Sequence, residues 1–247
     1  MRLGAQHDPI GRLCDLGRLG QRSERQLRDA GCRFKRQPLD RLARAGDYIV
    51  AAGGSKAAGH GAAVLPAIVY FNGERLAPDR VWLRQGSDQD IAVADDAAGH
   101  DFARLFAGTP LRISLSGEFA SLVWRKLLIN AVANPITTLT LQRQAVLRRP
   151  DVHALCLKIL DEAVAVARAE GVPVADDEPA RAMATLFTFS AELGTSMYFD
   201  RLAGRHLEVE ALTGAIVAAG ERHGVATPLN RALLTMLRAV DDAMGKG

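Results

Sequence analysis

Hydrophobic residues follow two different spacings along the chain, and the change falls near position 117. Between positions 64 and 116 they form short runs that end at turn residues or charges, which is the pattern of β-strands. The expected strands cover residues 64–71, 81–84, 90–94 and 111–115, and the turn residues between the first two are Asn72, Gly73, Pro78 and Asp79. A helix is expected over residues 97–107, between the third and fourth strands. This pattern predicts a small α/β layer that corresponds to half of a larger sheet.

After position 117 the hydrophobic residues recur every three or four positions, so this part is expected to be entirely helical. The first helix covers residues 118–133. Pro135 is expected to kink or end it, because proline lacks the N–H that a helix interior needs. Gly171 and Gly224 are expected to end helices, and Thr227 with Pro228 to cap and open the last one. The remaining expected helices cover residues 151–170, 178–193, 196–203 and 207–223.

The first 61 residues fit neither pattern. Arg, Asp and Gly interrupt the hydrophobic residues every few positions, and at most short helices are expected at 23–30 and 39–44. Residues 48–52 form a short apolar run, and the glycines of residues 53–63 are typical of a flexible linker. Their spacing matches neither a G-x-G-x-x-G turn nor a P-loop. The chain therefore divides into an atypical Arg- and Gly-rich arm and linker (1–61), an α/β part (62–116) and a helical part (117–247).

The composition is that of a folded protein. The chain has 247 residues, 48% of them hydrophobic and 24% charged, which suffices for the core of one large domain or two small ones. A disordered tail and a collagen-like polymer are excluded. The net charge is +3, and the excess lies in residues 1–45, with eleven basic against five acidic residues. We do not expect this arm to bind nucleic acid, because Phe34 is its one aromatic residue.

Cysteine and histidine spacings predict neither a disulfide framework nor a metal site. Cys14, Cys32 and Cys156 show no C-x-x-C spacing, and the six histidines form no H-E-x-x-H pair. The longest apolar run, residues 62–71, is about half as long as a membrane span and contains Pro66. We therefore expect a soluble, cytoplasmic protein with no metal and no membrane anchor.

Three polar residues share one stripe of the first expected helix. Lys126, Asn130 and Asn134 are spaced four residues apart, and each step turns the helix by only about 40° and rises by about 6 Å. The rest of this helix is strongly apolar, so the stripe is expected to border a cleft. A lysine there can act as a general acid, and the two amides can orient a carbonyl or hydroxyl group. The alternative is an ordinary half-exposed lysine beside asparagines that bond the nearby backbone.

A second group of polar residues lies in the segment 193–214. Thr195 or Ser196 can cap a helix, whose first-turn N–H groups are then available to an anion. Glu208 lies near the start of the next expected helix, where the helix dipole favours a carboxylate. The alternative assigns structural roles: Ser196 as a cap only, Asp200 with Arg205 as an ion pair, and Glu208 as a surface charge.

Together these segments resemble the ketopantoate reductase family, the 2-dehydropantoate 2-reductases. The family has a W-x-K-x-x-x-N-x-x-x-N-P helix, then an S-M-x-x-D-x-x-x-x-R-x-x-E segment and a G-V-x-T/V-P turn, and all three occur here in that order. The runs VLPAIVYFN and DIAVADD are similar to the second half of its nucleotide-binding domain. The resemblance implies an incomplete Rossmann-like N-terminal domain at 62–116. An all-helical substrate and catalytic domain at 117–247 would follow, similar to the C-terminal domain of 6-phosphogluconate dehydrogenase.

The resemblance also implies an activity, the NADPH-dependent reduction of 2-dehydropantoate to (R)-pantoate for pantothenate and coenzyme A synthesis. The substrate would be a small 2-oxo acid. Lys126 would donate a proton to its carbonyl oxygen, and Asn130 and Asn134 would hold its oxygens. Ser196 would bind the carboxylate, and Glu208 would contact the substrate hydroxyl or the cofactor. At the position of a further family asparagine this chain has Gln144.

The first part of the chain departs from the family. The family's first strand with its G-x-G-x-x-G turn, and its later lysine and Asn-Gly loop, have no recognisable counterpart before position 62. The arm is either diverged or the product of a shifted frame or start, and without the G-x-G-x-x-G turn both the binding of NADPH and the activity of the chain stay open. Two alternatives stay open: another 2-oxo or β-hydroxy acid dehydrogenase, or a non-enzymatic helical binding or dimerisation module. Assembly into a homodimer is also left open.

Overall fold

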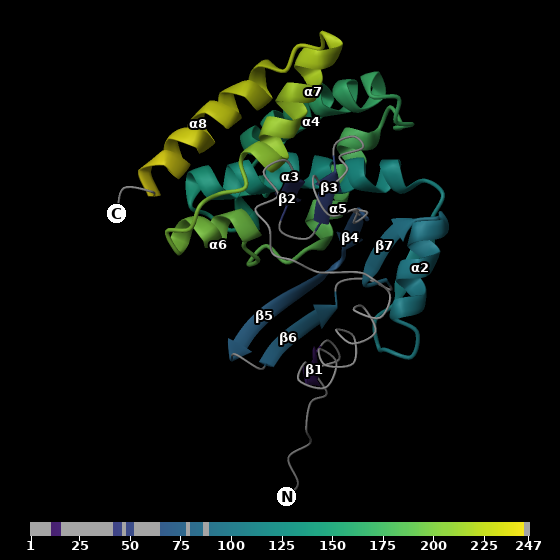
Figure 1. Ribbon diagram of the computed structural model, residues 1–247. Coiled ribbons are helices and arrows are strands. Elements are labelled where there is room, and N and C mark those ends of the chain that lie inside the picture. Colours follow the sequence, from purple (N-terminus) through teal and green to yellow (C-terminus); the bar gives the residue numbers. More distant parts are fainter. Residues whose placement is uncertain are drawn as a thin grey trace, which may run out of the picture. The chain divides into compact units, whose positions relative to one another are not determined.

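The computed structural model describes residues 11–15, 42–45, 48–51, 65–77, 80–85 and 89–244 (Figure 1). Its internal contacts divide the chain into two units. We call them the sheet unit, Met1–Asp40 with Gly53–Phe119, and the helical unit, Arg41–Ala52 with Ala120–Gly247. An incomplete Rossmann-like part thus precedes a helical domain, which confirms the predicted fold class.

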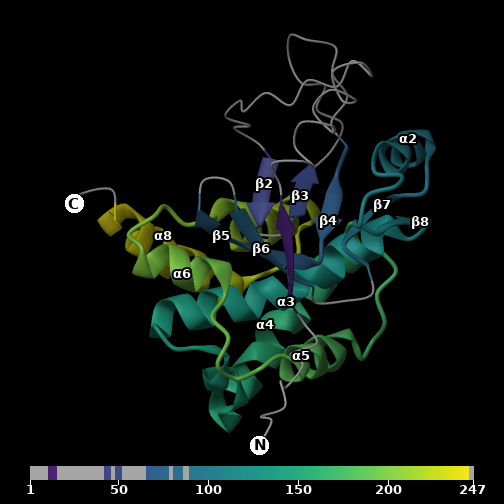
Figure 2. The ribbon, with the colours of Figure 1, turned by 90° about the horizontal axis from the view of Figure 1, so that it is seen from below.

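A strand–helix–strand motif organises the sheet unit. β7 (Ile91–Ala94) and β8 (Ile113–Ser116) are parallel, and α2 (Ala97–Leu105) joins them and lies beside them (Figure 2). β4 (Ala67–Val69) pairs antiparallel with β7. Parallel strands joined by a helix are the repeating unit of nucleotide-binding sheets. The strands expected here and the helix between them are confirmed.

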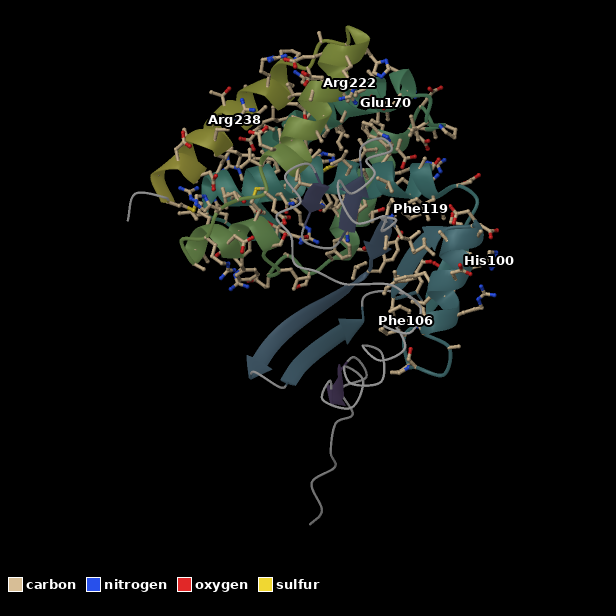
Figure 3. All side chains as sticks on the ribbon, viewed as in Figure 1. His100, Phe106, Phe119, Glu170, Arg222 and Arg238 are labelled. Carbon is tan, nitrogen blue, oxygen red and sulfur yellow. The ribbon has the colours of Figure 1, made fainter. Side chains whose placement is uncertain are left out.

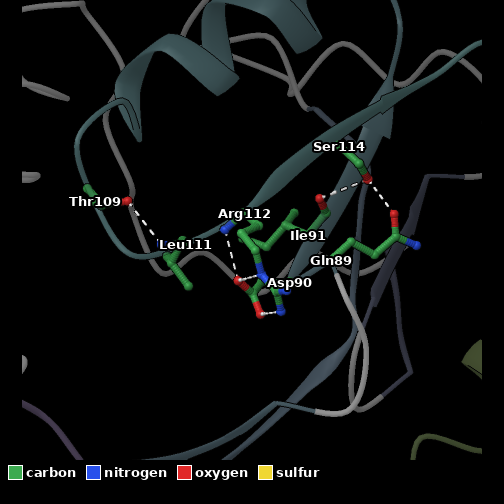
Figure 4. A network of polar contacts seen from close by, with 7 residues as sticks. All are labelled: Gln89, Asp90, Ile91, Thr109, Leu111, Arg112 and Ser114. Atoms are coloured by element: carbon green, nitrogen blue, oxygen red, sulfur yellow. Dashed lines mark hydrogen bonds and ion pairs between the residues drawn. The ribbon is translucent and has the colours of Figure 1, made fainter. Parts of the chain in front are cut away.

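Polar side chains fix the register of this motif at the start of both strands (Figure 4). The fully buried Asp90 accepts a hydrogen bond of 2.8 Å from the backbone N–H of Arg112 and pairs with its guanidinium at 3.3 Å. Ser114 donates to the side-chain oxygen of Gln89 at 2.7 Å. A buried carboxylate needs such partners, so this network resists a slip of β7 against β8.

A second sheet in this unit has the strand order β1-β6-β5, all antiparallel. These strands are β1 (Gly11–Asp15), β5 (Phe71–Ala77) and β6 (Arg80–Gln85). Asn72 and Gly73 pair with Arg84 and Leu83 inside β5, so the turn predicted at these two residues is wrong. Ladder hydrogen bonds to β6 keep this segment extended despite its turn-forming residues. The connection, residues 78–79, lies outside the described residues.

The arm contributes a hairpin that its sequence pattern does not predict. β2 (Leu42–Ala45) and β3 (Tyr48–Ala51) are antiparallel and belong to the helical unit. The short helix expected at 39–44 is therefore wrong, because pairing with β3 satisfies the backbone of β2 in an extended form. The helix expected at 23–30 and the linker at 53–63 lie outside the described residues.

The long helix α3 (Phe119–Thr140) is the buried centre of the helical unit. Of the two outcomes predicted at Pro135, a kink or an end, the end is wrong, because the helix runs on through this residue. Proline withholds the N–H that would bond the carbonyl of Ala131. The whole stretch from Ala131 to Thr138 is buried, and we infer that tertiary packing offsets the missing hydrogen bond.

Shorter elements complete this unit, and two of them differ from the predicted ranges. The expected helix 178–193 ends early, as α5 at Thr188. The expected helix 207–223 begins as a loop and a π-helical turn, η2, before α7. Gly171 and Gly224 have φ of 79° and 67° and end their helices as predicted. The elements are η1 (Gln144–Arg148), α4 (Pro150–Ala169), α5 (Glu178–Thr188), α6 (Ser196–Leu202), η2 (Glu210–Gly214), α7 (Ala215–His223) and α8 (Pro228–Met244).

The last helix is capped from a distance. α8 begins at Pro228 as predicted, but the buried hydroxyl of Thr227 makes no hydrogen bond within the described residues. Glu162 on α4 instead accepts from the N–H groups of Leu229 at 2.9 Å and Asn230 at 3.0 Å. A carboxylate at this end suits the helix dipole, and it ties α8 to α4.

Candidate functional site

The three residues of the predicted stripe lie on α3, and their burial increases along it. Lys126 and Asn130 are half-buried, whereas Asn134 is only 2% exposed. Leu127, Leu128 and the residues from Ala131 to Ala133 fill the core around them. The stripe thus leads from the half-exposed end of the helix into the interior of the helical unit.

The second predicted segment begins at the N-terminus of α6. Thr195 caps this helix, because its hydroxyl accepts from the N–H of Tyr198 at 3.2 Å. Ser196 is the first residue of α6 and is exposed. The alternative in which Ser196 is the cap is therefore wrong, and its side chain is left for another role.

Two contacts fasten α6 to the C-terminal half of α3. The hydroxyl oxygens of Thr137 and Thr195 lie 2.8 Å apart, and both residues are buried. The guanidinium of Arg201 donates to the carbonyl oxygens of Thr138 and, at 3.2 Å, Leu139. Thr137 is three residues after Asn134 and so lies on the same side of α3. The structure therefore brings the two motifs, which are far apart in the sequence, to one part of the helical unit.

Glu208 lies in the loop between α6 and η2 and is half-buried between the buried residues Leu207 and Val209. Asp241 on α8 holds this loop, because its carboxylate accepts from the N–H of Leu207 at 2.6 Å and lies 3.3 Å from a ring nitrogen of His206. No local spacing predicts Asp241, which is 34 residues from Leu207. This contact fixes the backbone on the N-terminal side of Glu208.

Asp200 and Arg205 form the ion pair that the structural alternative predicts. The guanidinium of Arg205 donates to the Asp200 carboxylate at 2.8 Å. The pair closes the end of α6 ahead of the Glu208 loop. For these two residues the structural alternative is therefore confirmed.

Ion pairs on the surface join other elements of the helical unit. Glu170 accepts from Arg222 at 2.7 Å (Figure 3). It also lies 2.9 Å from a ring nitrogen of His223. Partial burial alone would raise the pKa of Glu170, but these hydrogen bonds hold it below the ordinary value. Arg238 on α8 pairs in the same way with Glu210 of η2, at 2.5 and 2.8 Å. These carboxylates are engaged in joining helices.

Two further polar residues of the helical unit, Glu178 and Gln144, each have a buried side-chain oxygen with no hydrogen-bond partner among the described residues. The side chain of Glu178, at the start of α5, is 5% exposed and faces Arg125, the neighbour of Lys126, at 3.5 Å. In the sequence, Glu178 is indicated only by its position in the first turn of an expected helix. Gln144, which replaces the family asparagine, begins η1, and its N–H donates to the carbonyl of Leu193 at 3.0 Å.

Within the described part of the chain, no group of three His, Cys, Asp or Glu residues could hold a metal ion. No helix in that part is long and apolar enough to cross a bilayer. Burial raises the pKa of the Cys156 thiol to about 12, so this side chain is no nucleophile.

Comparison with known proteins agrees with the motifs. The sequence model described as the ketopantoate reductase PanE/ApbA C terminal matches residues 118–241. The 2-dehydropantoate 2-reductase of Mycobacterium tuberculosis is 36% identical over 183 residues, which are 74% of this chain and 61% of that protein. The enzyme of the same name from Caulobacter vibrioides is 34% identical, over 71% of this chain and 60% of that protein. The chain thus spans about three fifths of the length of these relatives.

Solved structures point the same way. A dimeric ketopantoate reductase from Staphylococcus aureus superposes with a TM-score of 0.66 at 31% identity, over 72% of this chain and 62% of that one. A ketopantoate reductase of the PanE/ApbA family from Ralstonia eutropha has a TM-score of 0.64 at 28% identity, over 72% of this chain and 59% of that one. By sequence and by fold, this chain belongs to the ketopantoate reductase family.

Proposed function

We propose that the helical unit binds 2-dehydropantoate and supplies the proton for its NADPH-dependent reduction to (R)-pantoate, a step toward pantothenate and coenzyme A. One observation carries the proposal. Lys126, Asn130 and Asn134 form a stripe on α3 that leads into the core, and the bond between Thr137 and Thr195 holds the start of α6, with Ser196, against the same helix.

Each residue has a role that its chemistry suits. Lys126 donates a proton to the 2-oxo oxygen and stabilises the negative charge that develops there. Asn130 and Asn134 orient the substrate oxygens without adding charge. The Ser196 hydroxyl donates to the carboxylate, and Glu208 accepts from a substrate hydroxyl or from the cofactor. All five residues belong to the helical unit.

The hydride would come from NADPH, whose phosphates need a cradle of backbone N–H groups at a helix N-terminus. The described residues of the sheet unit do not fit them. The N-terminus of α2 is already capped by the Asp96 carboxylate, which accepts from Gly99 at 2.8 Å, and Asp95 lies beside it. Two carboxylates repel a pyrophosphate. We therefore derive no step through the cofactor, and we expect substrate binding to be better preserved than turnover.

Calorimetry of the full chain tests the two halves separately. NADPH and 2-dehydropantoate are titrated singly and together, and NADPH oxidation is followed with 2-dehydropantoate and with other 2-oxo and β-hydroxy acids. Binding of 2-dehydropantoate that Asn134→Ala or Ser196→Ala weakens supports the proposal. No binding under any of these conditions overturns it, and a preference for another acid favours the related dehydrogenases.

The assembly is tested independently. The Staphylococcus aureus ketopantoate reductase is described as dimeric, and we propose a homodimer for this chain as well. Sedimentation velocity over a range of concentrations measures it. Self-association without any ligand binding would instead favour a non-enzymatic dimerisation module.

A further inference from the structure

A pair of buried hydroxyl groups links α3 to α6. Thr137 has no exposed surface and Thr195 is 9% exposed, and their hydroxyl oxygens are 2.8 Å apart. The two residues are 58 positions apart in the sequence. Leaving a buried polar group without a hydrogen bond costs free energy, so this contact constrains how the two helices pack.

The direction of each hydrogen bond can be assigned. The N–H of Tyr198 can only donate, so the Thr195 hydroxyl accepts from it at 3.2 Å. The carbonyl of Ala133 can only accept, so the proton of Thr137 points to it, at 2.7 Å. The proton between the two hydroxyls is then that of Thr195. The result is one directed chain from the first turn of α6 to the backbone of α3.

This chain ends beside two residues of the proposed site. On α3 it reaches the carbonyl of Ala133, next to Asn134, and on α6 it begins one residue before Ser196. Arg201 provides a second link through the carbonyls of Thr138 and Leu139. A carboxylate and a 2-oxo group are adjacent in a 2-oxo acid, so the groups that bind them need a fixed separation.

We propose that Thr137 and Thr195 are positioning residues that set the distance between Ser196 and Asn134, and thereby the fit of the 2-oxo acid. This inference rests on the proposed function. It assigns to Thr137 and Thr195 a role in substrate binding through Ser196, without contact to the substrate.

Two substitutions at Thr137 test its hydroxyl group. Thr137→Val keeps the shape of the side chain and removes the hydroxyl, and Thr137→Ser keeps the hydroxyl. Thr138→Val is the control, since Thr138 is equally buried and its hydroxyl has no partner among the described residues. The dissociation constant of 2-dehydropantoate, measured with NADPH present, should rise about 5- to 30-fold in Thr137→Val. It should return close to wild type in Thr137→Ser and stay there in Thr138→Val.

A double-substitution cycle separates positioning from general stability. If Thr137 acts through Ser196, Thr137→Val has little further effect on binding once Ser196→Ala is present. A merely structural role would give the same factor in both backgrounds. Should Thr137→Val not fold, Thr195→Ala breaks the same link from α6 and is expected to weaken binding in the same way.

The outcomes are distinct. Equal binding by Thr137→Val and Thr138→Val, while Ser196→Ala binds weakly, overturns this inference and leaves the proposed function standing. Additive losses in the cycle also overturn it. If the wild-type chain binds no 2-dehydropantoate, the proposed function falls, and the positioning role falls with it.

Discussion

The helical unit and the sheet unit differ in how much of a site each contains. In the helical unit, Lys126, Asn130, Asn134, Ser196 and Glu208 come from α3, α6 and the following loop, which buried contacts hold in place. In the sheet unit, the described residues form the parallel pair β7 and β8 with β4 antiparallel beside it, and a small antiparallel sheet, and the N-terminus of α2 carries two carboxylates. We therefore expect substrate binding and cofactor binding to be separable in this chain.

The difference has a physical origin. Side chains on one helix can form a substrate site as soon as that helix is packed, because the helical period alone aligns them. A pyrophosphate site needs a tight glycine turn between a strand and a helix, and other polar residues cannot replace the backbone N–H groups of that turn. We therefore expect the helical unit to keep the proposed substrate site even though the described residues of the sheet unit supply no such turn.

The largest expected effect tests the proposed role of Lys126 in the helical unit. Lys126→Ala should lower the rate of 2-dehydropantoate-dependent NADPH oxidation by about 100- to 10,000-fold, because it removes the proposed proton donor. Lys158→Ala, at an exposed lysine of α4, is the control and should leave the rate unchanged. Turnover that survives Lys126→Ala would show that this lysine is an ordinary surface residue.

The next effect concerns the core of the helical unit. Leu128 on α3 is fully buried, so Leu128→Ala should lower the free energy of unfolding by about 2–5 kcal/mol. Trp124 lies in α3 and Trp82 in β6, so variants that keep only one tryptophan report on the two units separately during denaturation. The transition seen by Trp124 should move and that seen by Trp82 should not. Equal shifts of both would mean that the units unfold together.

A smaller effect is expected from the sheet unit. A Cβ atom at Gly99 would overlap the carbonyl oxygen of Ala94 and lie 3.3 Å from a methyl carbon of Leu115. Gly99→Ala should therefore destabilise the motif of β7, α2 and β8 by about 1–3 kcal/mol. Gly117→Ala, with nothing within 4 Å of the new atom, should be neutral. Below the transition temperature Gly99→Ala should leave 2-dehydropantoate binding intact, and a loss of binding would contradict the separation of the two units.

Local patterns in the sequence predict much of this fold. The helical period aligns Lys126, Asn130 and Asn134 on α3, and the positive φ of Gly171 and Gly224 ends helices where glycine was expected to end them. These features depend on a few neighbouring residues. The roles of the site residues, and the domain boundaries at 61 and 116, stay predictions, because they concern ligands and long-range organisation.

Contacts between distant residues account for what the sequence does not predict. Burial lets α3 continue through Pro135, and pairing with β6 keeps Asn72 and Gly73 extended. Glu162 takes over the capping expected of Thr227 from a position 67 residues before Leu229. The bond between Thr137 and Thr195 is of the same kind, since neither residue has a spacing that indicates the other.

The smallest effect is electrostatic and lies at the edge of the helical unit. Hydrogen bonds from Arg238 hold the pKa of Glu210 below the ordinary value of 4.5. A depressed pKa means that the pair stabilises the fold at neutral pH. This contribution is lost as the pH falls below 4.5 and through the lower pKa that Glu210 has in the folded protein. The side chains of Glu210 and Arg238 are 66% and 54% exposed, so screening limits the effect of Glu210→Gln to about 0.2–1 kcal/mol at pH 7.

Urea denaturation at several pH values measures the free energy of unfolding of this variant. The control is Glu118→Gln, at an exposed residue directly before α3. The deficit should shrink in acid and in high salt. A deficit that persists in acid would mean that Glu210 stabilises η2 by packing as well as by charge.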